Sequence, residues 1–280
     1  MTEPKALKVG ILGATGAVGE QMMIVLAERN FPVAELRLFG SSRSAGSKLA
    51  FKGKEYEVEE ASLERMKGLD LLLGAADNDV AKKFLPDAAK LGVTVVDNSS
   101  AFRLDPEVPL VIPEVNPEDV KWSKGLIANP NCATIIGLTA IAPLHRKAKV
   151  KRLIASTYQA VSGAGKGGID ELEAEVKAPA GTPAPCKVFP YPIAYNLIPQ
   201  IGGFNDEGYT SEEMKMQNEG RKMLHDDNLL VSCTCVRVPI IRSHSEALTI
   251  EFENEISPEE ARELLKDAPG VRLWDEPEEK

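Results

Sequence analysis

The 280-residue chain has no long apolar run and few aromatic residues, which make up 5% of the sequence. A membrane-spanning helix needs roughly 18 consecutive apolar residues, and no such stretch occurs, so we expect no membrane span. The first residues, Met1–Lys8, are polar and lead directly into a strand-like segment, without the apolar stretch of a signal peptide. A cytoplasmic protein is therefore expected.

Cysteine is also scarce, and its spacing fits neither a disulfide framework nor a zinc site. The four cysteines are Cys132, Cys186, Cys233 and Cys235, and none belongs to a Cys-x-x-Cys pair. Cys233 and Cys235 share one face of a strand-like run, which is typical of small core residues. We expect no bound metal.

A block of basic residues is missing as well. The chain has 33 Lys and Arg residues against 42 Asp and Glu residues, for a net charge of −9. An acidic chain without a basic block is poorly suited to the phosphate backbone of DNA or RNA, so nucleic-acid binding is not expected. A locally basic pocket for a small anion stays compatible with this composition.

The remaining composition is that of an ordinary globular protein, with 43% hydrophobic and 27% charged residues, and the length predicts about two domains. In the first half, strand-like segments alternate with helical ones. This alternation predicts an α/β, Rossmann-type parallel sheet with right-handed crossovers. Strands are expected at 7–12, 34–39, 69–73 and 93–96, and helices at 20–29 and 80–91.

The second half has longer strands with fewer helices between them, which favours an α+β domain with a mixed or antiparallel sheet. We place the domain boundary between residues 131 and 132, giving a nucleotide-binding domain, 1–131, and a second domain, 132–280. In the second domain, strands are expected at 151–159, 229–239 and 247–252, helices at 133–145, 168–177, 211–226 and 257–267, and a proline-rich loop at 178–192.

The segment Gly13–Gly19, GATGAVG, follows the first strand and opens the first helix. Glycines let a backbone approach a pyrophosphate, and a helix N-terminus offers N–H groups to it, so the segment predicts dinucleotide binding. No Lys-Ser or Lys-Thr pair follows the glycines, which argues against a P-loop NTPase. The residues expected to contact the cofactor here are Gly13, Thr15, Gly16, Ala17, Val18 and Gly19.

The end of the second strand indicates which dinucleotide is bound. NAD enzymes usually carry an Asp or Glu there for the ribose hydroxyl, whereas this chain has Ser41, Ser42 and Arg43. An arginine and hydroxyl groups suit the additional 2′-phosphate of NADP. NADP is therefore the expected cofactor.

Cys132 begins the long apolar helix of the second half, after Asn129-Pro130-Asn131. The positive end of the helix dipole favours its thiolate, and the N–H groups there are candidates for holding an oxyanion. The chain has three histidines to serve as proton partner. His145 is expected to cap helix carbonyls and His225 to lie on the surface, whereas His244 lies between two strands and is the expected general base.

A nicotinamide cofactor, a thiolate and a histidine together predict aldehyde oxidation through a thioester, or the reverse reaction. In the oxidative direction the thiolate adds to the aldehyde and the hemithioacetal gives up a hydride. A second nucleophile then cleaves the thioester.

Motifs along nearly the whole chain resemble the aspartate-β-semialdehyde dehydrogenase family. They are GATGAVG at 13–19, SSRSAG at 41–46, VVDNSSAFR at 95–103, PEVN at 113–116, NPNCATI at 129–135, STYQAVSGAG at 156–165, YPIAYNLIPQIG at 191–202, EEMKM at 212–216 and CVRVP with RSHSE within 235–246. The resemblance implies NADPH-dependent reduction of L-aspartyl-4-phosphate to aspartate semialdehyde and phosphate, a step toward lysine, methionine and threonine.

The resemblance also implies residue roles. Cys132 becomes the nucleophile, His244 the acid/base, and Gln159 the residue that orients the acyl group. Substrate binding falls to Arg103 and Lys215 for phosphate, Asn131 beside the thiol, Arg237 for the carboxylate and Glu212 for the ammonium group. Ser162, Gly163 and Gly165 are expected to contact the cofactor.

The second domain of this family also dimerises, so a homodimer or homotetramer is expected. Family members continue beyond the position of Lys280 with a segment that returns to the dinucleotide domain, and that segment is expected to be absent here. Three alternatives stay open: an N-acetyl-γ-glutamyl-phosphate reductase, whose substrate has no free ammonium for Glu212, an archaeal-type malonyl-CoA reductase, and a non-catalytic Rossmann-type binding or regulatory protein.

Overall fold

The computed structural model describes residues 5–179, 181–183, 186–276 and 278. The chain divides into two compact units. The first unit consists of Met1–Val111 and Glu118–Pro130, and the second of Ile112–Pro117 and Asn131–Lys280. Among the described residues, no helix combines the length and the apolar character needed to cross a bilayer.

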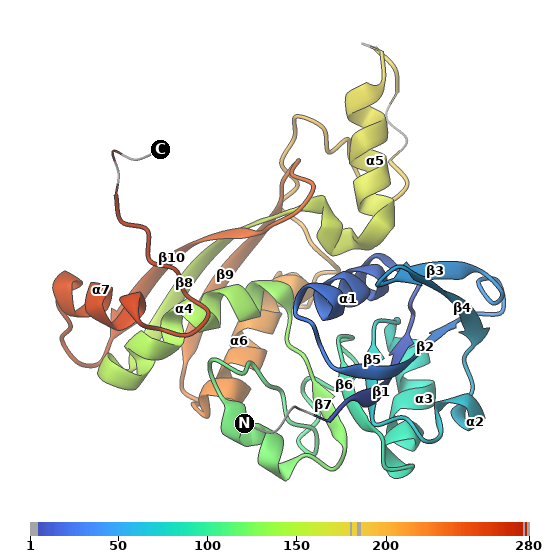
Figure 1. The fold of residues 1–280 in the computed structure, drawn as a ribbon. Coiled ribbons are helices and arrows are strands. Elements are labelled where there is room, and N and C mark those ends of the chain that lie inside the picture. Colours follow the sequence, from blue (N-terminus) through green and yellow to red (C-terminus); the bar gives the residue numbers. More distant parts are fainter. Residues whose placement is uncertain (1–4, 180, 184–185, 277, 279–280) are drawn as a thin grey trace. The chain divides into compact units, whose positions relative to one another are not determined.

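A seven-stranded sheet forms the centre of the first unit, in the order β3-β4-β2-β1-β5-β6-β7 (Figure 1). All neighbouring strands are parallel except the β3–β4 pair. The elements of this half of the chain are β1 (Leu7–Leu12), α1 (Ala17–Glu28), β2 (Val33–Gly40), β3 (Lys48–Phe51), β4 (Lys54–Glu60), α2 (Leu63–Met66), β5 (Leu71–Gly74), α3 (Asn78–Lys90), β6 (Thr94–Asp97), η1 (Pro117–Trp122) and β7 (Leu126–Ala128).

The chain leaves β1 toward β2 on one side and later returns to β5 on the other side of β1. This reversal makes the carboxyl ends of β1 and β5 the topological switch point, where doubly wound sheets bind their ligands. Val9 and Ile11 of β1 are fully buried and pack with Met23 and Leu26 of α1, as expected for a strand covered by crossover helices. The predicted Rossmann-type sheet is confirmed.

A β-hairpin between the second and third predicted strands was not expected from the sequence. In this hairpin β3 pairs with β4 around Lys52 and Gly53, whose φ angles are +46° and +77°. Two positive φ values in a two-residue loop are the mark of a tight hairpin turn. The hairpin extends the parallel sheet beyond β2.

The second unit contains a mixed three-stranded sheet in the order β10-β8-β9, with β10–β8 antiparallel and β8–β9 parallel. This confirms the predicted mixed sheet. Its elements are α4 (Cys132–Ala148), β8 (Val150–Gln159), η2 (Val161–Ala164), α5 (Gly165–Lys177), α6 (Ser211–Leu224), β9 (Leu230–Arg237), β10 (Ser245–Phe252) and α7 (Pro258–Lys266).

Helices α4 and α6 pack on this sheet, and α7 packs against α4 (Figure 1). The core between them includes Ile141, Leu153 and Met216 together with Cys233 and Cys235, which are buried as expected. Capping boxes begin both α6, at Thr210, and α7, at Ser257, so the chain itself signals where these helices start.

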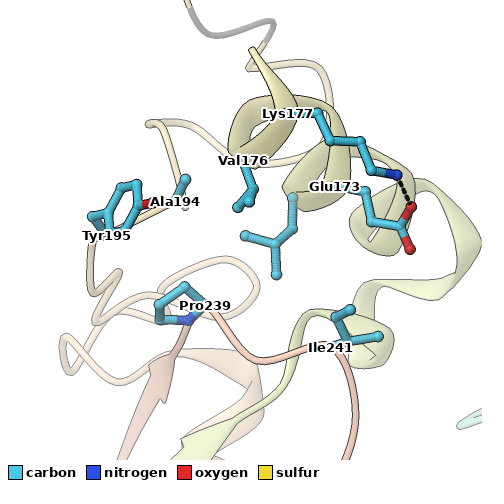
Figure 2. Close-up of a pocket in the computed structure, with 8 residues that line it drawn as sticks. Glu173, Val176, Lys177, Ala194, Tyr195, Pro239 and Ile241 are labelled. Atoms are coloured by element: carbon cyan, nitrogen blue, oxygen red, sulfur yellow. Dashed lines mark hydrogen bonds and ion pairs between the residues drawn. The ribbon is translucent and has the colours of Figure 1, made fainter. Parts of the chain in front are cut away.

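The proline-rich loop is held against α5 by two carboxylates. Glu171 accepts hydrogen bonds from the backbone N–H groups of residues 187, 188 and 189, and Glu175 accepts from those of residues 193 and 194. A largely apolar groove of about 470 Å³ lies beside this region. Figure 2 shows side chains that line it. It is lined by Leu172, Glu173, Val176, Lys177, Ala194, Tyr195, Pro239 and Ile241.

Candidate active site

The glycine turn of the first unit follows β1 at the switch point. Gly13 has a φ of +86°, and a side-chain carbon there would lie 2.8 Å from the backbone carbonyl of Ala75. A side-chain carbon on Gly19 would lie 2.4 Å from the carbonyl oxygen of Gly13. Both positions therefore need glycine, because a Cβ at 13 meets the backbone that follows β5 and a Cβ at 19 meets the turn itself.

A cavity of about 610 Å³ opens at the carboxyl ends of β1, β2, β4 and β5. The N-cap residue of α1 is Gly16, which has no side chain, so no side-chain hydrogen bond caps the start of this helix among the described residues. Such a helix N-terminus suits a pyrophosphate, so the cavity fits the expected dinucleotide. The lining residues are Leu12, Gly13, Thr15, Gly16, Gly40, Ser41, Ser42, Arg43, Ser44, Glu60, Ala61, Ala75, Ala76, Asp77, Val80, Lys83 and Phe84.

The structure brings Ser41, Ser42 and Arg43 to the same cavity as the glycine turn, whereas Ala17, Val18 and Gly19 belong to α1. Three charged residues of the lining were missed from the sequence: Lys83 on α3, Asp77 at the N-cap of α3 and Glu60 at the end of β4. Lys83 lies between one and two turns into α3, the helix that follows β5. Its position near the switch point could therefore have been predicted from the sequence.

Cys132 is the first residue of α4, and its thiol is exposed. The N-cap of this helix is Asn131, whose Oδ1 accepts the backbone N–H groups of Ala133, at 2.9 Å, and Thr134, at 3.3 Å. The cap occupies the N–H groups of Ala133 and Thr134, so these two do not provide the expected oxyanion contact in this structure. Asn131 directly precedes the helix, which is a typical capping position.

His244 lies next to the thiol, with its Nε2 atom 3.2 Å from Cys132 Sγ. On the other side of the ring, Nδ1 accepts the backbone N–H of Ala160 at 3.0 Å. Burial lowers the pKa of His244, and the positive charge of Arg237 lowers it further, while Glu212 acts in the opposite direction. The pair thus has the contact distance that cysteine chemistry requires.

Glu212, near the start of α6, connects three of the predicted site residues. Its carboxylate accepts from Asn131 Nδ2 at 2.8 Å and Gln159 Nε2 at 3.1 Å, and it pairs with Lys215 Nζ at 2.6 Å. Burial works against its ionisation, but the Lys215 ammonium and these hydrogen bonds outweigh burial and hold the pKa of Glu212 below its usual value. The carboxylate is therefore charged at neutral pH.

Arg237 ends β9, and it is buried despite its charge. Its Nη1 donates to the carbonyl oxygen of Ala160 at 2.7 Å. A side-chain carbon on Gly163 would lie 2.5 Å from Nη1, so the guanidinium explains why glycine occupies that position. A cavity of about 520 Å³ opens beside Arg237, and it is also lined by Ala164, Cys186, Lys187, Val188, Phe189, Pro190, Gln200, Ile201 and Gly202.

The remaining predicted residues make other contacts within their own units. Arg103 belongs to the first unit, where Nε donates to the carbonyl of Asn129 and Nη2 to that of Asn98, at 3.0 and 2.9 Å. Ser162 and Gly165 lie in the second unit, at η2 and the start of α5. Ser162 donates its backbone N–H to the carbonyl of Ile241.

The two other histidines, His145 and His225, make contacts different from those of His244. His225 is exposed at the left-handed C-cap of α6, as expected. His145 was expected to donate to helix carbonyls, and for its Nδ1 atom this prediction is wrong. Nδ1 instead accepts a hydrogen bond from the backbone N–H of Val150 at 3.2 Å. Lys149 adopts a positive φ at the end of α4 and turns the chain back, so the next strand offers a donor at this point.

Sequence reasoning also missed two buried acids. Glu219 Oε2 accepts the backbone N–H of Asn131 at 2.7 Å, which ties α6 to the start of α4. Both carboxylate oxygens of Glu246 are buried without a hydrogen-bond partner among the described residues. In the part of the chain that the structure describes, no cluster of His, Cys, Asp and Glu side chains suits a metal ion.

Comparisons with known proteins show which family the chain belongs to. Residues 8–123 match the family described as semialdehyde dehydrogenase, NAD binding domain, and residues 141–280 match semialdehyde dehydrogenase, dimerisation domain. The aspartate-semialdehyde dehydrogenase of Aquifex aeolicus is 53% identical over 276 residues, which are 97% of this chain and 81% of the relative. The chain belongs to the aspartate-semialdehyde dehydrogenase family.

Solved members of the aspartate-semialdehyde dehydrogenase family share the fold. Aspartate semialdehyde dehydrogenase II from Vibrio cholerae, solved in complex with ASA, is 43% identical with a TM-score of 0.92, covering 97% of this chain and 82% of that one. The enzyme from Candida albicans, solved with NADP, is 26% identical with a TM-score of 0.70, covering 94% and 76%. The resemblance inferred from the motifs is confirmed, and these relatives support none of the three alternatives.

Proposed function

We propose that this chain reduces L-aspartyl-4-phosphate to L-aspartate 4-semialdehyde and phosphate with NADPH, and catalyses the reverse reaction. The observation that carries the proposal is the 3.2 Å contact between Cys132 Sγ and His244 Nε2 in a chain of this family. Charged groups of this chain suit the substrate, because Arg237 and Glu212 of the second unit match a carboxylate and an ammonium group. Lys215 of the second unit and Arg103 of the first unit are the groups assigned to the phosphate.

In the reductive direction, Cys132 sulfur attacks the acyl carbon, a carbon–sulfur bond forms, and the bond to the phosphate oxygen breaks. Gln159 orients the acyl group, and its own amide is held in place by Glu212. When bound, NADPH supplies the hydride that reduces the thioester carbon. The carbon–sulfur bond then breaks, the aldehyde forms, and the sulfur returns as a thiolate beside Nε2 of His244.

The cofactor is assigned to the residues of the cavity at the switch point, Gly13, Thr15, Gly16, Ser41, Ser42 and Arg43, with Ala17, Val18 and Gly19 supporting the turn. Ser162, Gly163 and Gly165 complete the proposed contacts from the second unit. Residues 1–131 then form the cofactor-binding domain, and residues 132–280 the catalytic and dimerisation domain.

The match of residues 141–280 to a dimerisation domain supports a homodimer, and a homotetramer built from such dimers is compatible with it. A cytoplasmic location belongs to the same proposal, since NADPH and amino-acid biosynthesis are found there. Light scattering at micromolar concentration tests the assembly, and a monomer contradicts it.

Phosphate-dependent formation of NADPH from L-aspartate 4-semialdehyde tests the activity. We expect absorbance of NADPH to appear only when the aldehyde, NADP and phosphate are all present. N-acetyl-L-glutamate 5-semialdehyde serves as the matched control aldehyde, because it lacks the ammonium group assigned to Glu212. Faster turnover of the acetylated aldehyde contradicts the proposal.

A further inference from the structure

Three consecutive backbone N–H groups of the proline-rich loop meet at one carboxylate. Oε2 of Glu171 accepts hydrogen bonds from Lys187 and Val188, at 2.8 Å each, and Oε1 accepts from Phe189 at 3.1 Å. Glu171 lies on α5 and is only 5% exposed. A buried carboxylate needs hydrogen-bond donors, and the loop backbone supplies three of them.

The loop segment that carries these N–H groups belongs to no helix or strand. Residues 186–192 adopt neither, and among the described residues the N–H groups of 187–189 donate to no backbone carbonyl. Glu171 thus supplies the acceptors that a neighbouring strand supplies in a sheet. The path of this segment therefore depends on the position of the Glu171 carboxylate.

The same segment forms part of the wall of the cavity beside Arg237. Residues 187–190 line this cavity of about 520 Å³. Further along the loop, the backbone of Ile198 is joined to that of Arg237 by two hydrogen bonds, at 3.0 and 2.9 Å. The loop is thus held to α5 by Glu171 and to β9 by Arg237.

We propose that Glu171 is a positioning residue for substrate binding: its buried carboxylate holds residues 187–189 in place and so shapes the cavity in which Arg237 receives the carboxylate of the aldehyde. The proposal rests on the proposed function for the role of Arg237. Glu171 does not contact the substrate in this assignment, because its oxygens are occupied by the N–H groups of the loop.

The consequence is expected for substrate binding and not for the bond-forming steps. Sγ of Cys132 and Nε2 of His244 are 3.2 Å apart, and neither residue lines this cavity. A displaced loop changes how the aldehyde fits against Arg237, but it leaves the contact between the thiol and the ring. KM for the aldehyde therefore reports on Glu171, and kcat is expected to stay near its wild-type value.

The loop keeps other contacts with α5 when Glu171 is changed. Glutamine offers one acceptor oxygen in place of two, and its amide nitrogen donates, so at least one of the three N–H groups loses its acceptor in Glu171→Gln. A buried apolar cluster does not depend on the carboxylate, so this variant is expected to fold. The cluster consists of Val161, Leu172, Phe189, Ile193 and Ile198.

Glu175, one turn further along α5, provides a matched control. Its Oε2 accepts from the backbone N–H groups of Ile193 and Ala194, at 2.9 and 2.7 Å. Ala194 lines the apolar groove, and neither of these two residues lines the cavity beside Arg237. Glu175→Gln therefore removes the same charge and the same type of contact from a different part of the loop.

Steady-state kinetics with L-aspartate 4-semialdehyde and phosphate, each varied in turn with NADP saturating, compares both variants with the wild type. In Glu171→Gln we expect KM for the aldehyde to rise by roughly tenfold, the scale of one lost hydrogen bond to a charged group. We expect kcat and KM for phosphate to stay near their wild-type values, and Glu175→Gln to keep all three. An unchanged KM for the aldehyde in a folded Glu171→Gln variant overturns the proposal, as does an equal rise in both variants or a loss confined to kcat.

Hydrogen exchange followed by mass spectrometry tests the contacts without any turnover. In the unmodified chain we expect the amides of 187–189 to exchange more slowly than freely exposed amides, although they belong to no helix or strand. Glu171→Gln should accelerate exchange at 187–189, and Glu175→Gln at 193–194. Unprotected amides at 187–189 in the wild type overturn the proposal, and this result does not depend on the folding of a variant.

The two measurements separate this inference from the proposed function. An active chain whose amides at 187–189 are unprotected contradicts this inference and leaves the proposed function intact. A chain that is inactive toward L-aspartate 4-semialdehyde contradicts the proposed function, and the exchange data then still decide whether Glu171 holds the loop.

Discussion

Single residues around the thiol serve both the fold and the chemistry. Asn131 caps α4 through Oδ1 and donates to Glu212 through Nδ2. Glu212 in turn holds Gln159 and Lys215. A substitution at any of these positions therefore changes the helix start or a neighbouring side chain as well as the contact assigned to the substrate.

His244→Asn tests the partner of the thiol. We expect turnover to fall by about 10²–10⁴-fold, because the group positioned at Cys132 Sγ is lost. Steady-state rates with saturating substrates measure the loss. His225→Asn is the matched control, since His225 is exposed at a left-handed C-cap that asparagine tolerates. Near-normal turnover in His244→Asn would remove His244 from the mechanism.

Lys215 and Arg237 are expected to bind different substrates. Lys215→Leu should raise KM for phosphate more than KM for the aldehyde, and Arg237→Leu should do the reverse. The reason is that phosphate is assigned to Lys215 and the aldehyde's carboxylate to Arg237, and a bidentate guanidinium suits a carboxylate. Separate KM values for both substrates check this, and equal effects on the two would contradict the assignment.

Glu246 is a buried acid without a hydrogen-bond partner among the described residues, and burial raises its pKa from 4.5 to about 7. The folded state therefore holds this proton more tightly than the unfolded state. Stability contributed by this group is present below a pH of 4.5 and is lost as the pH rises to about 7. At higher pH the carboxylate destabilises the fold by at most about 3 kcal/mol.

Glu246→Gln should remove that penalty. We expect the free energy of unfolding of the variant to exceed that of the wild type at pH ~8 and the two to approach each other at pH ~4, following the raised pKa. Urea unfolding at both pH values measures the difference. A constant difference across this range would show that Glu246 does not titrate as its burial indicates.

Among the elements, strands with an apolar pattern and helices with a clear start signal were predicted from the sequence. The buried strands β1 and β8 and the capped helix α7 lie within a few residues of their predicted positions. The β3–β4 hairpin was missed because β3 is only four residues long and β4 carries mostly charged side chains, and only the Lys52-Gly53 pair signals its turn.

The candidate site, too, could be predicted from the sequence only in part. The sequence identified Cys132 and His244 and, through the resemblance, the charged residues near them. Asn131 capping α4 is a local contact that its position before the helix could have predicted. The backbone contact of Ala160 with His244 could not be predicted, because it joins residues 84 positions apart.

The loop after β2 and the helix α3 together form the expected phosphate-selective end of the cofactor cavity. Arg43 and Lys83 both line it, and two cations favour the 2′-phosphate of NADP. Arg43→Ala and Lys83→Ala should each narrow the preference for NADP over NAD by roughly tenfold, as the loss of one charge-assisted contact implies. Fluorescence titration with both cofactors measures this, with Lys82→Ala as a neighbouring lysine control. A preference unchanged in both Arg43→Ala and Lys83→Ala would refute this account of selectivity.

For the whole molecule, the net charge of −9 opposes the binding of anionic substrates at long range. The local placement of cations offsets this repulsion. Arg43 and Lys83 line the cofactor cavity, together with Glu60 and Asp77, and Arg237 lines a cavity of the second unit. An acidic chain with cations placed in its cavities limits nonspecific binding to polyanions, while single cations remain available to small anions.

The central claim is that turnover proceeds through a covalent bond to Cys132. The most direct test is the Cys132→Ala variant, assayed for phosphate-dependent NADPH formation and titrated with NADP in parallel. The account predicts that turnover is abolished while NADP affinity stays at the wild-type value, because the cofactor cavity lies in the first unit and contains no atom of Cys132. Substantial turnover in a Cys132→Ala variant that binds NADP normally would contradict it.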